Sequence, residues 1–321
     1  MKWMETRRWY RWFGEVEAGR VSPTYERLGR AVAGDAVLVE RLDALPKWKR
    51  QPNLLFGVTR YLGGPVEDPD ASRAWVLAHW DRVVAEMSRR STQTNEAGRC
   101  APLLPLLAAL PQPLALLEVG TSAGLCLYPD RYAYDFGGHR LGTGPVTLTC
   151  AVAGPVPLPS ELPTVVWRAG LDLNPLDPGS AEDLRWLEAL VWPEQEHRRR
   201  RLRAAAAVAA SEPPLVVRGD LRTDLPDLAA RAPADATLVI MHTAVLAYLE
   251  PAEREAFART VTKLPGHWIS NEGGAVFPWQ SEAAGLPPET AARFVLALDD
   301  RAVALSEPHG ASLTWLETNG V

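Results

Sequence analysis

The spacing of apolar residues changes about one third of the way along the chain. Before residue 111, apolar positions recur every three or four residues, which is the spacing of helices with one buried face. Ser22-Pro23 is a typical helix start, because serine caps free N–H groups and proline suits the first helical position. Apolar side chains from Val76 to Met87 share one face of a helix predicted over residues 72–90. We therefore predict an all-helical domain or lid over residues 1–110.

After Pro111-Gln112-Pro113, short apolar runs alternate with helical patterns, as βαβ units in a parallel sheet require. The predicted strands are Leu114–Val119, Thr164–Leu171, Leu215–Arg218, Thr237–Met241, His267–Ser270, Phe294–Leu298 and about Leu313–Leu316. The predicted helices are about Ala181–Leu190, Glu194–Ala210, Leu225–Ala230 and Pro251–Thr262. Residues 294–306, interrupted by Asp299-Asp300, fit an antiparallel hairpin. The sequence thus predicts a Rossmann-like α/β domain over residues 111–321, with a mostly parallel sheet.

The segment from Leu114 to Leu125 carries the clearest chemical signal. A buried strand reaches Glu118 and then enters a turn with Gly120 and Gly124, before an expected short helix. Glycine lets the backbone turn sharply and approach a ligand, and a helix N-terminus offers unpaired N–H groups. An acidic residue at the end of this strand favours a cationic ligand. S-adenosylmethionine, which carries a sulfonium and an ammonium group, is such a ligand.

Two later strands also end in carboxylates. Asp172 follows the second strand, where nucleotide-binding α/β folds place an acid against ribose hydroxyls. Asp220 follows the third strand and is a candidate acceptor for an adenine amino group, although Asp before a helix is also a good N-cap. The long separation from Gly120 to Asp172 predicts an insertion at about residues 129–160, whose alternating pattern fits a β-hairpin around Gly137-Gly138 and Gly142.

Two further residues lie at the same predicted edge of the sheet. His242 follows the fourth strand and is the candidate general base, since a neutral imidazole accepts a proton near pH 7. A histidine that only bonds the backbone is the competing interpretation. Glu272 follows the fifth strand and either faces the crevice or caps a turn.

Together these segments resemble class I S-adenosylmethionine-dependent methyltransferases, in which Glu118, Gly120 and Gly124 match the first motif and Asp172 the ribose position. Many of those enzymes have glycine where this chain has Ser122. The resemblance implies cofactor contacts from Glu118, Gly120, Thr121, Ser122, Gly124, Asp172, Asn174 and Asp220.

Almost the whole chain is also similar to an uncharacterised bacterial family known as domain of unknown function 2332, for which no substrate is established. The similarity rests on blocks spread along the sequence, namely Arg50–Leu55, Gln93–Glu96 with Arg99, Glu118–Gly124 through Tyr132, Trp167–Pro175, Trp186–Glu196, Val217–Asp220, His242–Leu249 and Pro308–Gly310.

The helical region ahead of the sheet is predicted to exclude water and shape the acceptor pocket. The candidate lid or substrate residues are Gln93, Thr94, Asn95, Glu96, Arg99, Tyr128 and Tyr132. A loop whose polar side chains cap helices is the competing interpretation of residues 93–96. The acceptor is expected to be a small molecule.

Two other functions compete with methyl transfer. Gly120-Thr-Ser122-Ala-Gly124 fits the nucleophile elbow of α/β-hydrolases, and His309 follows in the required order. That fold needs several strands before the nucleophile, whereas residues 1–113 predict helices. The second alternative is a non-catalytic protein that binds an adenosyl nucleotide or a related metabolite.

Composition narrows the choice of partners. Residues 1–113 carry 17 basic and 13 acidic side chains, whereas residues 114–321 carry 17 and 26, so nucleic acid is not an expected partner. The basic run from His197 to Arg203 is interpreted as a solvated helix face. Three cysteines without metal-ligand spacing predict no metal site and favour a reducing cytoplasm. No apolar stretch predicts a signal peptide or a membrane span.

Overall fold

The computed structural model describes residues 5–19, 21–93, 95–287, 290 and 293–316. The chain forms two compact units. The first comprises residues 1–94 and 180–200, and the second comprises residues 95–179 and 201–321. The helical unit thus takes a segment from the middle of the region that the sequence assigns to the α/β domain, and its N-terminal part ends before residue 110.

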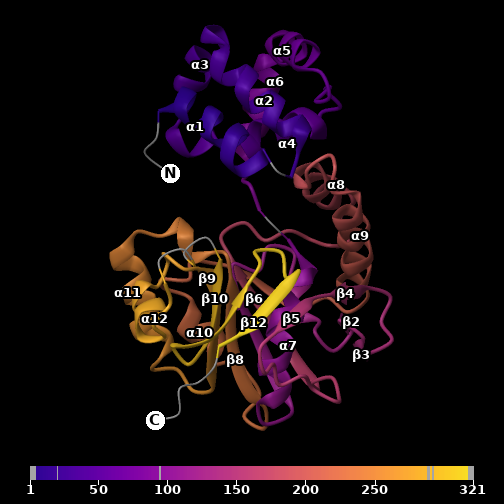
Figure 1. The fold of residues 1–321 in the computed structure, drawn as a ribbon, viewed down its shortest axis with the longest axis vertical. Helices are drawn as coiled ribbons and strands as arrows, with labels where there is room; N and C mark the ends of the chain where they lie inside the picture. The colour runs from indigo at the N-terminus through magenta and orange to yellow at the C-terminus, as the bar shows by residue number, and fades with distance from the viewer. Residues whose placement is uncertain (1–4, 20, 94, 288–289, 291–292, 317–321) are drawn as a thin grey trace. The chain divides into compact units, whose positions relative to one another are not determined.

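The first unit is helical in the part of the chain that is described (Figure 1). Its helices are α1 (Thr6–Trp12), the π-helix η1 (Phe13–Ala18), α2 (Pro23–Gly34), α3 (Ala36–Asp43), the 3-10 helix η2 (Lys47–Lys49), α4 (Pro52–Tyr61), α5 (Pro69–Ala78), α6 (Trp80–Arg89), α8 (Ala181–Leu190) and the start of α9 (Glu196–Ser211).

The helix start at Ser22 is confirmed, because its hydroxyl accepts a hydrogen bond from the Tyr25 N–H group and Pro23 begins α2. The single helix predicted over residues 72–90 is wrong. Two helices, α5 and α6, meet at His79, whose φ of −117° and ψ of 23° leave the helical region. The apolar spacing continues across this break, which is why the pattern alone does not reveal it.

Aromatic side chains form the core of the helical unit. Trp192 packs edge-on against Phe13, with ring centroids 5.8 Å apart, and lies 5.8 Å from the Tyr25 ring. The Trp192 indole N–H also donates to Asn53 Oδ1 at 2.9 Å. Glu194 accepts hydrogen bonds from the Ser22 hydroxyl and the Thr24 N–H group. Residues 180–200 are therefore part of this core.

The second unit contains a nine-stranded sheet in the order β5-β12-β11-β10-β9-β8-β1-β6-β7. Its strands are β1 (Leu114–Val119), β5 (Ala151–Ala153), β6 (Val165–Asp172), β7 (Leu215–Arg218), β8 (Thr237–Thr243), β9 (His267–Gly273), β10 (Phe294–Leu298), β11 (Arg301–Ser306) and β12 (Ser312–Trp315). Strands β7, β6, β1, β8 and β9 are parallel, in the order 3-2-1-4-5 of doubly wound folds.

The C-terminal strands continue this sheet in antiparallel fashion. The hairpin predicted over residues 294–306 is confirmed, since β10 pairs antiparallel with β9 and with β11. Asp299 and Asp300 form its turn with φ values of 49° and 67°. Aspartate tolerates this left-handed conformation better than most residues. The fold is thus α/β, with N-terminal helices followed by a mostly parallel sheet and a C-terminal antiparallel part.

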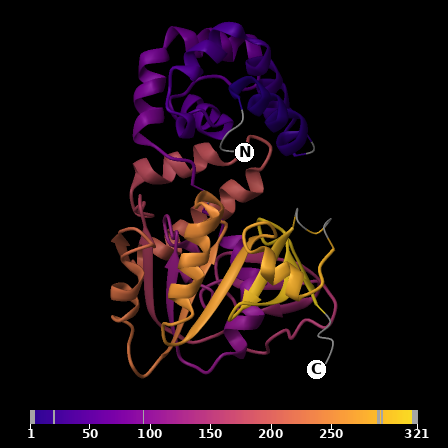
Figure 2. The ribbon, with the colours of Figure 1, turned by 90° about the vertical axis from the view of Figure 1, so that its left-hand side faces the viewer.

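Helices cover both faces of the large sheet. The side chains of Leu117 and Val119 on β1 join a buried cluster with α10 (Leu225–Ala229), α11 (Pro251–Val261) and Phe277, which precedes α12 (Pro278–Ala283). Figures 1 and 2 show α11, in orange, lying along this face. Since side chains alternate along a strand, Glu118 points to the opposite face, where α7 (Cys100–Ala109) packs against β10.

The insertion after β1 differs from the expected hairpin in two respects. Strands β2 (Ala133–Phe136) and β3 (His139–Leu141) do form a hairpin at Gly137-Gly138. However, β4 (Thr147–Thr149) pairs parallel with β2, and β5 leaves to join the edge of the large sheet beside β12. The connection from β1 to β6 therefore contains a small sheet where doubly wound folds place a helix.

Candidate functional site

The candidate site lies where the order of the parallel strands reverses. Strand β1 has β6 on one side and β8 on the other, so the connections leaving β1 and β8 diverge at the carboxyl edge. Ligands of doubly wound folds bind in the crevice at such a point. The sequence-predicted residues Glu118, Asp172 and His242 all lie on strands that end at this edge.

The loop after β1 has the geometry of a tight turn. Gly120, Ser122 and Gly124 have φ values of 71°, 51° and 72°, so Ser122 occupies a left-handed conformation that glycine adopts more readily. A Cβ atom on Gly120 would lie 2.3 Å from a Val245 methyl carbon, which explains the need for glycine there.

The short helix expected after the loop is a 3-10 helix of three residues, η4 (Leu125–Leu127). Pro129 comes two residues after it, and proline cannot continue a helix at low cost. Any ligand of this loop is therefore held by individual backbone and side-chain groups, and the N-terminus of a long helix does not contribute.

Glu118 is buried beneath the loop. It is 5% exposed, and its Oε2 atom accepts a hydrogen bond from the Thr121 hydroxyl at 2.8 Å. Burial raises the pKa of this carboxyl to about 8, and nearby Asp172 raises the pKa further, whereas the Thr121 hydrogen bond and the charge of Arg99 lower it. At neutral pH the carboxyl is largely protonated, and a cation placed beside it would favour ionisation.

Asp172 joins the end of β6 to the glycine loop. Its Oδ2 atom accepts from the Ser122 N–H group at 2.8 Å, and its Oδ1 atom accepts from the Asn174 N–H group at 2.7 Å. Each carboxylate oxygen has a second lone pair, so Asp172 can still accept a hydrogen bond from a ligand. The exposed Asn174 side chain accepts from Arg218 at 3.3 Å.

Asp220 is engaged differently. The Arg222 side chain donates to both of its carboxylate oxygens, and Arg222 also pairs with Glu253. This pairing with Arg222 lowers the pKa of Asp220. The structure thus supplies a protein partner at the position that the sequence assigns to an adenine amino group.

Arg99 and Glu96 hold the segment before α7 against the site. The Arg99 Nε atom donates to the Pro308 carbonyl at 2.9 Å, and its Nη1 atom donates to the Thr243 carbonyl at 3.1 Å. Glu96 accepts from the Gly98 N–H group and pairs with Arg201 at 2.7 Å. Arg201 lies in the basic run that the sequence assigns to a solvated face, so that interpretation fails at this residue.

The other candidate lid residues are less informative. Asn95 belongs to the same unit as Glu96 and is half-buried, whereas Gln93 belongs to the helical unit. Thr94 lies outside the described residues. Tyr128 and Tyr132 are buried, and their hydroxyls donate to the Glu212 and Leu125 carbonyls at 2.6 and 2.7 Å.

His242 and Glu272 form a buried pair on the face covered by α11. The His242 Nδ1 atom lies 2.8 Å from Glu272 Oε1, and the Trp268 indole donates to His242 Nε2 at 2.9 Å. An indole N–H only donates, so Nε2 is the acceptor and Nδ1 carries the proton. His242 is fully buried with both nitrogens engaged. This geometry supports the interpretation of His242 as a structural histidine, and in it His242 has no nitrogen free for a substrate.

A family model described as "Uncharacterized protein conserved in bacteria (DUF2332)" matches residues 7–315. The chain belongs to DUF2332. Neither a curated protein nor a solved structure matches it. The family description includes no activity.

Several of the DUF2332-like sequence blocks have a structural role in this protein. Asn53 and Trp192 bond to each other in the helical unit. In the second unit, the Arg168 guanidinium donates to the Leu127 carbonyl and to Asp130, and lies 4.8 Å above the Tyr128 ring. This cluster fastens the insertion to β6.

Three buried polar atoms near the carboxyl edge have no hydrogen-bond partner among the described residues. They are Ser122 Oγ, Asn271 Nδ2 and Glu272 Oε2. Buried polar groups are normally satisfied, so Ser122 Oγ in the glycine loop and Asn271 Nδ2 mark the Glu118 side of the sheet as a candidate ligand site, whereas Glu272 lies on the face covered by α11. Asn271 pairs in register with Thr243 on the face of Glu118, and its Oδ1 atom accepts from Ser306 at 2.8 Å. Thr243, Val245 and Asn271 are not among the residues predicted for the site, because nothing in their local sequence pattern distinguishes them.

The structure offers little support for a serine nucleophile or for a metal site. A serine nucleophile needs a base, yet Ser122 Oγ contacts no hydrogen-bonding group within the described part of the chain. In the same part, no group of three or more His, Cys, Asp or Glu side chains is arranged to hold a metal ion. Among the residues searched, no helix combines the length and apolarity needed to cross a membrane.

Proposed function

We propose that this DUF2332 protein binds S-adenosylmethionine at the carboxyl edge of β1, β6 and β8 and uses it to methylate a small molecule. The observation that carries the proposal is a buried acid, Glu118, directly beneath a left-handed glycine loop at the point where the strand order reverses. The resemblance of residues 118–124 and Asp172 to class I methyltransferases supports the choice of this cofactor.

The residues present fit an adenosyl cation. Glu118 would pair with a positive group and lose its proton, because a nearby cation lowers the pKa of a carboxyl. Asp172 has lone pairs left for ribose hydroxyls, and its bond to the Ser122 N–H group already fixes its position. The unpartnered Ser122 hydroxyl and Asn271 amide would supply further hydrogen bonds.

When bound, the cofactor supplies an electrophilic methyl group on a positively charged sulfur. The protein then orients the acceptor and excludes water. Orientation alone can accelerate methyl transfer by a large factor, even where no side chain acts as a general base. Because His242 and the Tyr132 hydroxyl are engaged with protein groups, we expect an acceptor whose nucleophilic atom needs no proton removed by these residues.

Calorimetry with S-adenosylmethionine tests the cofactor site. We expect Glu118→Gln and Asp172→Asn each to weaken binding by about tenfold or more, since each loses a charge-assisted hydrogen bond. Asp227→Asn is the control, because Asp227 is an exposed carboxylate in the first turn of α10. Binding should also release a proton below pH 8, which appears as a heat that depends on the buffer. No heat with correctly folded protein would refute the cofactor assignment.

A second candidate function is binding of the same cofactor without methyl transfer. It is favoured by one observation, that both nitrogens of the buried His242 are occupied. Incubation of bacterial small-molecule extracts with methyl-labelled S-adenosylmethionine separates the two functions. Label that moves to an extract component only with wild-type protein, and not with Glu118→Gln, supports transfer. Tight binding without any labelled product supports the non-catalytic function.

A further inference from the structure

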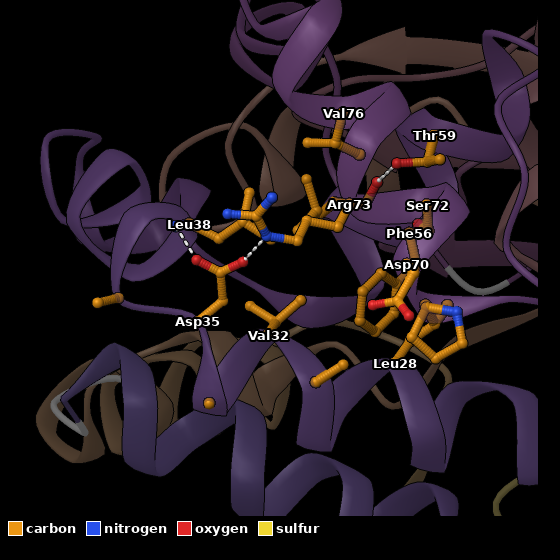
Figure 3. Close-up of a pocket in the computed structure, with 15 residues that line it drawn as sticks. Leu28, Val32, Asp35, Leu38, Phe56, Thr59, Asp70, Ser72, Arg73 and Val76 are labelled. Carbon is orange, nitrogen blue, oxygen red and sulfur yellow. Dashed lines mark hydrogen bonds and ion pairs between the residues drawn. The ribbon is translucent and has the colours of Figure 1, made fainter.

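The helical unit contains a cavity of about 490 Å³ that the proposed function does not use (Figure 3). It lies between α2, α3, α4 and α5, all within one unit. Ligand pockets for small molecules are usually between about 300 and 1,000 Å³. The cavity is therefore large enough for a small organic molecule.

The inner wall of the cavity is mostly apolar. Leu28, Val32, Phe56 and Val76 line it and are each at most 5% exposed. Ser72 and Thr59 are the buried polar residues of this wall, 5% and 1% exposed, and the Thr59 hydroxyl donates to the Leu55 carbonyl at 2.8 Å. The wall therefore offers a ligand mainly hydrocarbon contacts.

The cavity is also lined by three charged side chains, those of Asp35, Asp70 and Arg73. Asp35 and Arg73 form an ion pair, and Asp35 also accepts from the N–H groups of Val37 and Leu38 at the start of α3. Figure 3 shows this pair at one end of the cavity and Asp70 at the other. Because Asp35 and Arg73 neutralise each other, the exposed carboxylate of Asp70 is the unbalanced charge among the lining residues.

From this combination we infer that the helical unit binds a small amphipathic amine, with its apolar body among Leu28, Phe56 and Val76 and its cationic nitrogen toward Asp70. The apolar wall provides affinity through burial of hydrocarbon. The Asp70 charge provides selectivity, since a carboxylate ligand of the same shape would be repelled. This site is independent of the adenosyl site proposed above.

Three probes of matched shape test the inference with the full-length protein. They are 4-phenylbutylamine, 4-phenylbutanol and 4-phenylbutyrate, with affinities measured by titration calorimetry. We expect the amine to bind at least tenfold more tightly than the carboxylate, with the alcohol between them. Asp70→Asn should reduce this preference to less than twofold while leaving the affinity of the alcohol unchanged. Asp81→Asn is the matched control, because Asp81 occupies the first turn of α6 but does not line the cavity.

A further variant distinguishes the cavity from nonspecific surface binding. Ala31→Trp places a large ring at an exposed lining position and should abolish binding of all three probes. Equal binding of amine and carboxylate, unchanged binding by Ala31→Trp, or no binding of any probe to folded protein would overturn the inference.

Discussion

At the scale of single residues, Glu118 gives the sharpest prediction. Its pKa is about 8 in the folded protein against an ordinary 4.5, so between these pH values the folded state holds a proton that the unfolded chain has lost. Stability should therefore be greatest below pH 4.5 with respect to this group, fall as pH rises toward 8, and level off above it. The total loss is on the order of 3–5 kcal/mol.

Glu118→Gln should remove this contribution, because the amide does not ionise and its carbonyl still accepts from Thr121. Urea unfolding from pH 5 to pH 8.5 should show a flatter profile for Glu118→Gln than for wild type, with the difference largest at high pH. The exposed Asp227→Asn should follow wild type. Identical slopes for Glu118→Gln and wild type would contradict the assigned pKa.

The sequence predicts which acidic residues lie at the carboxyl edge of the sheet, but it does not predict the groups to which they hydrogen-bond. Glu118 and Asp172 follow from strand ends, which local patterning reveals. That Asp172 bonds to Ser122, or that Arg99 lies near Glu118, depends on how distant segments pack. The left-handed φ of Ser122 explains how this chain keeps the turn without glycine, since serine adopts that conformation at a modest cost.

At the scale of elements, Glu272 holds the connection after β8 against β9. Its Oε1 atom accepts from His242 Nδ1 and from the Val245 and Leu246 N–H groups, at 2.8 to 3.2 Å. Glu272→Ala would leave these buried donors without an acceptor and should destabilise the protein by about 3–5 kcal/mol in urea unfolding.

Glu272→Gln is the matched variant, since its amide oxygen still accepts hydrogen bonds. We expect it to lose about half of the stability that Glu272→Ala loses, or less. Equal losses for the two variants would show that the charge, and not the acceptor, matters. A Glu272→Ala protein as stable as wild type would rule out this anchoring role.

Most strands and helices of the second unit are predictable because each has its own apolar period. Strands β1 and β10 match their predicted bounds, whereas β8 and β9 run two and three residues beyond theirs. Those extensions place His242 and Glu272 inside strands, with partners fixed by the sheet. The parallel pairing of β4 with β2 was missed, because register between strands leaves no trace in local alternation.

At the scale of the whole molecule, the least predictable feature is which segments of the chain form each of the two units. Residues 180–200 follow a strand, and their sequence pattern predicts an ordinary crossover helix of the α/β unit. They belong instead to the helical unit. Trp186 is 1% exposed, and its contact with the Tyr61 ring at 5.8 Å is one reason. An amphipathic helix shows that it has a buried face, but its sequence does not show which core that face joins.

This arrangement predicts that a fragment of residues 1–110 will not fold stably. Without residues 180–200 it loses Trp192 from its aromatic core, Trp186 from beside α4, and the Glu194 carboxylate that accepts from Ser22 and Thr24. Losing even one large buried aromatic side chain costs about 3–5 kcal/mol, which is a large part of a domain's stability. Residues 1–94 joined by a flexible linker to residues 180–200 should instead unfold cooperatively. Circular dichroism during heating compares the two fragments, and cooperative unfolding of the 1–110 fragment at the same temperature would show that the internal segment is dispensable.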